Sequence, residues 1–173
     1  MRSLEVANLL VSKHGATIRP TNLSLNKLVY FAQVESLKTL GRPLFCDRIE
    51  AWEYGPVEPE VYHAFKGNGR RVITRTAGIR RAWDFAPNEE AVVDAVAEKY
   101  GQLGAFDLVR LSHREGGAWS RRYEPGTDAE ITVADILASD DYATDPDMDA
   151  TIAAGFRSVR EKWPNTLRML EDA

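Results

Sequence analysis

Apolar residues recur at helical spacing in several separate stretches of the chain. The clearest pattern runs from Leu25 to Leu40, and Gly41 followed by Pro43 predicts the end of that helix. Further helices are predicted over 3–14 (ended by Gly15), 59–66, 87–100, 105–117, 118–123, 132–139 and 149–162. In the 105–117 helix the expected apolar set is Phe106, Leu108, Val109 and Leu111.

Strand patterns are few and short by comparison. Residues 48–53 alternate between two faces, which predicts a strand that is broken by Gly55 and Pro56. A second strand over 129–132 could pair with it, and residues 70–82 are expected to be extended. The predicted fold class is therefore mainly α: a single compact helical domain with a minor short β element.

Composition and charge narrow the class of protein. The chain has 173 residues, 44% of them hydrophobic, which suits one domain with its own core. Its formal net charge of −4 makes nucleic acid an unlikely partner. The lone cysteine, Cys46, excludes an internal disulfide framework and fits a reducing compartment. The apolar stretches fall short of the roughly 18 residues of a membrane span, so a cytoplasmic location without membrane association is expected.

A search for catalytic chemistry finds no convincing candidate, and the expected catalytic, metal and cofactor sets are all empty. The three histidines lie far apart, without zinc-ligand spacing. Adjacent helical residues diverge by about 100°, so Ser112 and His113 cannot form a nucleophile–base dyad. His113 and Glu115 could co-operate only through a third element, and a local hydrogen bond of His113 is the favoured interpretation. The sequence predicts a protein that is not an enzyme.

Two surface features leave alternatives open. The basic run over 66–81 could hold phosphates, hold an acidic protein surface, or be an ordinary solvated loop. Aromatic residues in polar surroundings either fill the core at helix–loop joints or form a rigid binding face. They are Trp52, Tyr54, Tyr62, Trp83, Trp119 and Tyr123.

Five motifs in order resemble one known family. They are K-L-x-Y-x-A-Q from Lys27, G-R-P-L-F from Gly41, E-A-W-x-Y-G-P-V from Glu50, V-Y-x-x-F-K-G from Val61 and L-S-H-x-E-x-x-x-W from Leu111. Together they resemble the Panacea domain of phage-associated, SocA-like antitoxins over roughly residues 5–140. Val29 stands where a leucine is expected, and residues 145–173 lie outside the family pattern.

The resemblance implies an antitoxin that neutralises a cognate protein toxin by direct binding. An alternative within the family is a proteolytic adaptor, which delivers the toxin to an ATP-dependent protease. A different alternative is a nucleic-acid-binding regulator that uses the basic stretch 66–81. The implied division is a Panacea-like domain over 1–140 and, over 141–173, an acidic linker plus a C-terminal helix. That helix would pack on the domain or on a partner, and a homodimer stays open.

Site residues follow from the aromatic and basic positions within these motifs. Trp52 and Phe65 are expected to point mostly inward, and Trp52, Gly55, Pro56 and Gly67 are expected to fix the loop geometry. The predicted partner-binding residues are Tyr54, Tyr62, Lys66, His113, Glu115, Trp119, Arg121 and Arg122.

Overall fold

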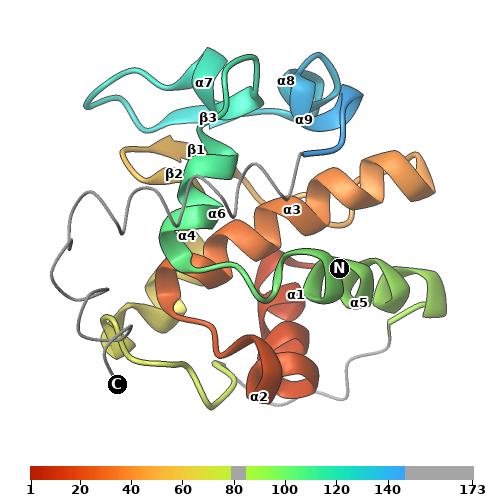
Figure 1. Ribbon diagram of the computed structural model, residues 1–173, viewed down its shortest axis with the longest axis vertical. Helices are drawn as coiled ribbons and strands as arrows, with labels where there is room; N and C mark the ends of the chain where they lie inside the picture. Colours follow the sequence, from red (N-terminus) through yellow and green to blue (C-terminus); the bar gives the residue numbers. More distant parts are fainter. Residues whose placement is uncertain (79–84, 147–173) are drawn as a thin grey trace, which may run out of the picture.

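The computed structural model describes residues 1–78 and 85–146 of the chain. Within these ranges the protein is mainly helical with one small antiparallel sheet, as the sequence predicted (Figure 1). The predicted helix 149–162 lies outside the described residues, as do Arg80, Arg81 and Trp83. The helices are α1 (Ser3–Leu9), α2 (Gly15–Ile18), α3 (Asn22–Leu40), α4 (Pro59–Phe65), α5 (Pro87–Tyr100), α6 (Ala105–Ser112), α7 (Ala118–Arg122), α8 (Val133–Leu137) and α9 (Asp140–Ala143). The strands are β1 (Ile49–Trp52), β2 (Gly55–Val57) and β3 (Ala129–Ile131).

Helix α3 crosses the centre of the molecule and forms the middle of its core (Figure 1). It begins at Thr21, whose side chain accepts a hydrogen bond from the backbone N–H of Ser24, and ends at Gly41 with a left-handed φ of 66°. Helices α1, α4, α5, α6 and α9 and strand β2 all pack against it. Most of its residues are buried, so the predicted apolar stripe is one part of a helix enclosed on several sides.

The predicted stop at Gly15 is wrong. A π-helical segment, Leu10–His14, follows α1, and α2 then continues through Gly15, whose φ of −54° is helical. Glycine permits a left-handed end but does not require one. The helical stretch ends instead at Arg19, which has a φ of 44° and precedes Pro20.

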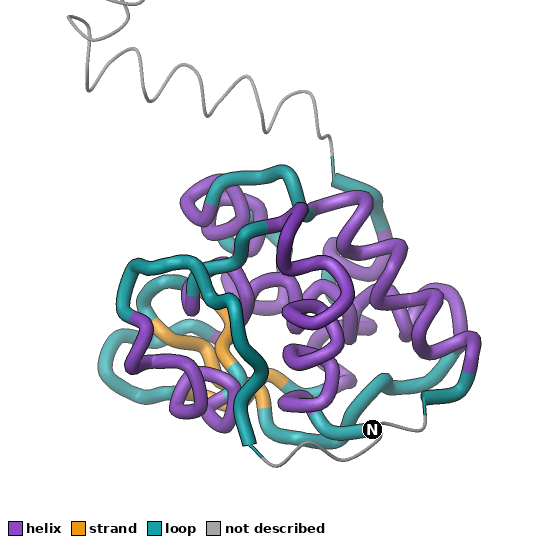
Figure 2. The backbone as a smooth tube through the Cα atoms, turned by 90° about the horizontal axis from the view of Figure 1, so that it is seen from below, coloured by secondary structure: helices purple, strands orange, loops and turns teal. Residues whose placement is uncertain are grey.

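Three strands form the sheet, in the order β2–β1–β3 with β1 antiparallel to both neighbours. Figure 2 shows them gathered at one side of the molecule. The predicted pairing of the two strand segments is confirmed, with Ile49 opposite Ile131. Gly55 and Pro56 do not break the sheet: they begin β2, which folds back on β1 as a hairpin. Pro56 is tolerated there because β2 is an edge strand.

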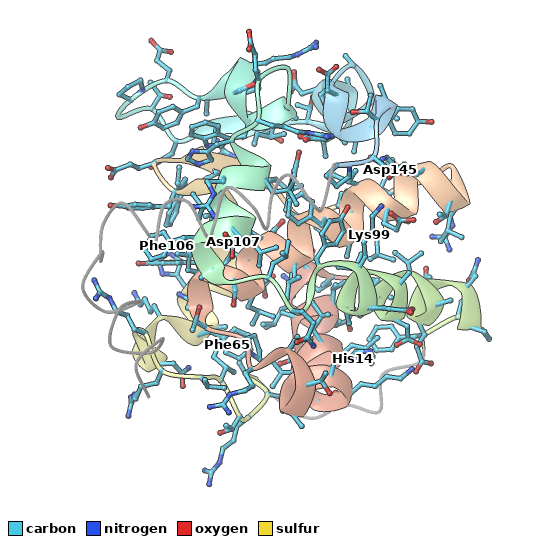
Figure 3. All side chains as sticks on the ribbon, viewed as in Figure 1. His14, Phe65, Lys99, Phe106, Asp107 and Asp145 are labelled. Atoms are coloured by element: carbon cyan, nitrogen blue, oxygen red, sulfur yellow. The ribbon has the colours of Figure 1, made fainter. Side chains whose placement is uncertain are left out.

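Two other predictions need correction. Phe106 (labelled in Figure 3), expected in the apolar face of α6, is 68% exposed. Leu108, Val109 and Leu111 are buried, as expected. The acidic segment expected to act as a linker begins with helix α9, which packs on α3 and buries Asp141. After α9, Asp145 accepts hydrogen bonds from Lys38 and Lys99, so the described chain stays attached to the domain (Figure 3).

Candidate functional site

Three polar residues of α3, spaced three apart, each bond a different segment. Gln33 binds the loop after α3: its Oε1 accepts from the backbone N–H groups of Leu44 (2.8 Å) and Phe45 (3.2 Å), and its Nε2 donates to the carbonyl of Phe45. Tyr30 donates to the carboxylate of Asp141 on α9 at 2.6 Å. Lys27 donates from Nζ to the carbonyl of Pro56 in the hairpin at 2.8 Å. The polar positions of the first motif therefore hold the domain together.

Asp141 is the centre of a buried polar group. Besides the Tyr30 hydroxyl, its carboxylate accepts from the backbone N–H of Ala118 and from Nε of Arg114. Burial and the charge of Asp141 raise the pKa of the Tyr30 hydroxyl well above its ordinary value. These bonds fix α7 and α9 relative to α3.

Lys27 and Glu58 lie beneath the hairpin, and both are fully buried. Burial lowers the pKa of the Lys27 ammonium from 10.5 to about 7, although the charge of Glu58 acts in the opposite direction. Burial raises the pKa of the Glu58 carboxyl from 4.5 to about 8, again opposed by its partner's charge. Neither carboxyl oxygen of Glu58 has a hydrogen-bond partner in the described part of the chain.

The Gly55 backbone runs directly over the side chains of Lys27 and Ser112. A Cβ at Gly55 would lie 2.6 Å from Oγ of Ser112 and 2.8 Å from Cε of Lys27. The residue also has a φ of 101°, which favours glycine. Both the close contacts and the backbone conformation therefore favour glycine at position 55.

His113 forms one layer of an aromatic stack. Its ring lies parallel to that of Trp119 at 3.5 Å between centroids, and Trp119 stacks in turn on Tyr123 at 4.6 Å. Burial, and then the charge of Lys27, lower the pKa of His113 to about 4, so the ring is neutral at neutral pH. Ser112 donates to the carbonyl of Val109 and not to His113, while Glu115 is exposed. The described geometry brings together no nucleophile–base pair here.

A cleft of about 470 Å³ opens beside the β1–β2 hairpin. It brings together three of the residues predicted to bind a partner, namely Tyr54, Tyr62 and Lys66, with Trp52. The rings of Trp52 and Tyr62 meet edge to face at 4.8 Å, while Tyr54 is 54% exposed. The cleft is also lined by Asn22, Leu23, Asn26, Glu53, Val57, Gly69 and Asp128.

The other predicted partner-binding residues lie on α6, α7 and the turn between them. Trp119 is buried and donates from Nε1 to the carbonyl of Trp52, which connects this group to the back of the cleft. Arg121 donates to the carbonyl of Ala138 and Arg122 to that of Glu130. Both arginines are exposed but already bond to the domain.

Sequence reasoning missed Asn26, Glu53 and Asp128 as cleft residues. Asn26 was hidden by its place in the long, largely apolar helix α3, although a polar residue inside such a pattern is itself a signal. Asp128 comes from the loop before β3, so only the pairing of β3 with β1 brings it near the cleft.

In residues 1–78 and 85–146, no group of three or more His, Cys, Asp or Glu could hold a metal ion. None of the helices described there is both long and apolar enough to cross a membrane.

Comparison with known proteins shows to which family the chain belongs. The model of the family described as "Antitoxin SocA-like, Panacea domain" matches residues 25–120, more than half of the chain. The chain belongs to the SocA-like, Panacea-domain family. The Panacea domain defined by that match begins at Leu25, two residues before the first motif, and contains all five motifs. It also contains most of the cleft, from Asn26 to Gly69.

A curated relative of this Panacea-domain protein is "Antitoxin SocA" of Caulobacter vibrioides (strain NA1000 / CB15N). The two are 38% identical over 124 residues, which is 66% of this chain and 66% of the relative. The match thus spans just under two thirds of the relative's length. No solved structure matches the chain.

Proposed function

We propose that this Panacea-domain protein is an antitoxin that neutralises a cognate protein toxin by direct binding, without catalytic turnover. The observation that carries the proposal is the aromatic cleft beside the hairpin, most of which lies within the family's own segment. The curated relative is named as an antitoxin, which supports the same function for this chain. An antitoxin of this kind needs a surface for its toxin and no reactive groups.

The cleft has the properties of a protein-binding surface. Tryptophan and tyrosine dominate the energetically important positions of interfaces, because they bury much area and lose little conformational entropy. Trp52 is held by a hydrogen bond from its Nε1 to Glu50, and its carbonyl accepts from Trp119. A site that is already fixed before binding loses less free energy on association. Tyr54 remains exposed and available to a partner.

The two alternative functions have less support from the described residues. In the basic stretch, Arg71 bonds to the carbonyls of Gly67 and Asn68, and the chain as a whole is acidic. A proteolytic adaptor would need a second surface for the protease in addition to the cleft. The growth experiment below separates this mechanism from direct neutralisation.

The test is growth rescue by co-expression with the toxin encoded beside this gene. Wild-type protein should restore growth, and the variant Tyr54→Ala/Tyr62→Ala should lose most of the rescue, since it removes two rings of the cleft. Phe106→Ala is the matched control because it removes an exposed ring on α6, outside the cleft. Rescue that persists in a host without its ATP-dependent proteases supports direct binding. Rescue that disappears there would replace this mechanism with the adaptor.

A further inference from the structure

The cleft carries acidic groups as well as aromatic rings. Glu53 and Asp128 line it, and neither carboxylate forms a salt bridge with a described residue. Lys66 is the one basic residue of the lining, so the lining carries one more negative than positive charge. Aromatic faces attract cations, and an arginine or lysine placed over a tryptophan or tyrosine ring is held by that attraction. The charges and the rings therefore favour the same kind of guest.

Asn26 adds to the cleft wall a side-chain oxygen that accepts no hydrogen bond from a described residue. Its Nδ2 donates to the backbone carbonyl of Asn22 at 2.9 Å and to Oδ1 of Asn22 at 3.3 Å. Both partners are acceptors, so the amide group can be oriented in only one way. Its Oδ1 has no hydrogen-bond partner in the described part of the chain, although Asn26 is 99% buried in the wall of the cleft. A buried acceptor left unpaired is costly. This oxygen is closed to water, so a guest that donates to it would do so on a small shift of the cleft wall and would relieve that cost.

We infer that the cleft receives an arginine side chain of the toxin, an inference that rests on the proposed function. A guanidinium is planar, so it can stack on the rings of Trp52, Tyr54 or Tyr62. Its five N–H donors suit the acceptors of Asn26, Glu53 and Asp128, which stand in the same lining. The volume of about 470 Å³ is ample for one such side chain and lies in the usual range of ligand sites. Lysine would supply the charge but not the planar stacking.

The probe is N-acetyl-arginine amide, compared with N-acetyl-citrulline amide, which has the same shape without the charge. Binding is followed by amide and indole chemical shifts of the full-length protein. The arginine probe should shift the Trp52 indole and the Asn26 side-chain signals, and the citrulline probe should bind at least several-fold more weakly. Asp128→Asn should weaken arginine binding about three-fold, and asparagine tolerates the left-handed φ of 47° found there. Glu98→Gln, an exposed residue of α5 outside the cleft, should leave binding unchanged.

Equal binding of the two probes, or no shift of the cleft signals at saturating probe, would overturn the inference. So would arginine binding that Asp128→Asn leaves intact while Glu98→Gln reduces it. The growth-rescue experiment tests the proposed function separately from the arginine-binding experiment. If cleft variants lose rescue but the arginine probe does not bind, the cleft binds the toxin through another chemistry. If wild-type protein fails to rescue, the proposed function itself is wrong.

Discussion

At the scale of single residues, the buried pair of Lys27 and Glu58 places two ionisable groups out of reach of water. Each is fully buried, and no hydrogen bond joins them. Lys27 is satisfied by the carbonyl of Pro56, whereas the carboxyl oxygens of Glu58 have no partner among the described residues. Transfer of a charge out of water is costly, so burial favours the neutral form of both groups. The stability of the protein should therefore depend on pH in a way that exposed residues cannot produce.

The first prediction concerns Glu58→Gln, which mimics the protonated carboxyl. Because burial raises the pKa of Glu58 from 4.5 to about 8, the folded state holds a proton that the unfolded state loses across that interval. The stabilisation that this proton gives the folded state is complete below pH 4.5. It is lost as pH rises toward 8, by at most about 1.4 kcal/mol of unfolding free energy per pH unit. The free energy of unfolding of the variant, relative to wild type, should rise between pH 5 and 7. Urea denaturation at several pH values measures it.

Lys27 gives the opposite slope at higher pH. Its pKa is lowered from 10.5 to about 7, so stability is lowest below pH 7 and is regained as pH rises toward 10.5. Lys27→Met should remove this recovery above pH 8, where the fall due to Glu58 is complete. Glu98→Gln, an exposed carboxyl of α5, is the control and should leave the whole profile unchanged. Parallel profiles for wild type and both buried-site variants would contradict the burial argument.

At the scale of elements, α3 organises the domain through Lys27, Tyr30 and Gln33. Each bonds a different segment: the hairpin, α9 and the loop after α3. The first motif is thus explained by polar contacts made inside the core. Polar networks of this kind tolerate the loss of one member poorly, because the remaining partners stay buried without water.

Gln33→Leu tests that role. The substitution leaves the N–H groups of Leu44 and Phe45 and the carbonyl of Phe45 without their partner. The free energy of unfolding should fall by about 3 kcal/mol, measured by chemical denaturation. Gln102→Leu changes the same residue type at an exposed position and should alter stability by less than about 0.5 kcal/mol. Equal effects of the two changes would show that Gln33 does not hold the loop.

The hairpin offers a comparison between two glycines. Gly41 and Gly55 both have a positive φ, but a Cβ at Gly41 meets nothing within 4 Å, whereas one at Gly55 meets Ser112 and Lys27. Gly41→Ala should cost about 1 kcal/mol of stability, from backbone strain alone. Gly55→Ala should cost about 3 kcal/mol or more, since overpacking adds to the strain. Thermal unfolding of the two variants measures both losses of stability. A loss of stability for Gly55→Ala no larger than that for Gly41→Ala would mean that the hairpin moves freely away from α3.

The elements that the sequence predicted best are those with a strong local signal. The spacing between Leu25 and Leu40 and the proline at the start of α4 were sufficient for their helices. Strand β2 was not predictable in the same way, because Gly55 and Pro56 disfavour a strand locally and only pairing with β1 stabilises one. Nor could the sequence show that Lys27 and Glu58 are buried, because charged residues in helical and loop patterns are usually exposed. Their burial is a consequence of packing between distant segments.

At the scale of the whole molecule, the account links a fixed helical domain to one open cleft. The cleft is lined by the start of α3, the hairpin, α4 with the residues that follow it, and the loop before β3. Lys27 of α3 also bonds the hairpin through the carbonyl of Pro56. Of the predicted binding residues, Tyr54, Tyr62 and Lys66 lie together there, a grouping that the motifs suggested but could not place in space. Trp119 supports the cleft through the Trp52 carbonyl. His113 stacks behind it as a neutral ring.

The measurement that tests the central claim most directly uses purified components only. The product of the neighbouring gene, as the proposed toxin, is mixed with the purified protein in the absence of any protease, and complex formation and toxin activity are followed together. The account predicts a stable complex on size-exclusion chromatography and stoichiometric loss of toxin activity, both abolished by Tyr54→Ala/Tyr62→Ala and retained by Phe106→Ala. A toxin that stays fully active when bound, or that does not bind at all, would contradict neutralisation by direct binding.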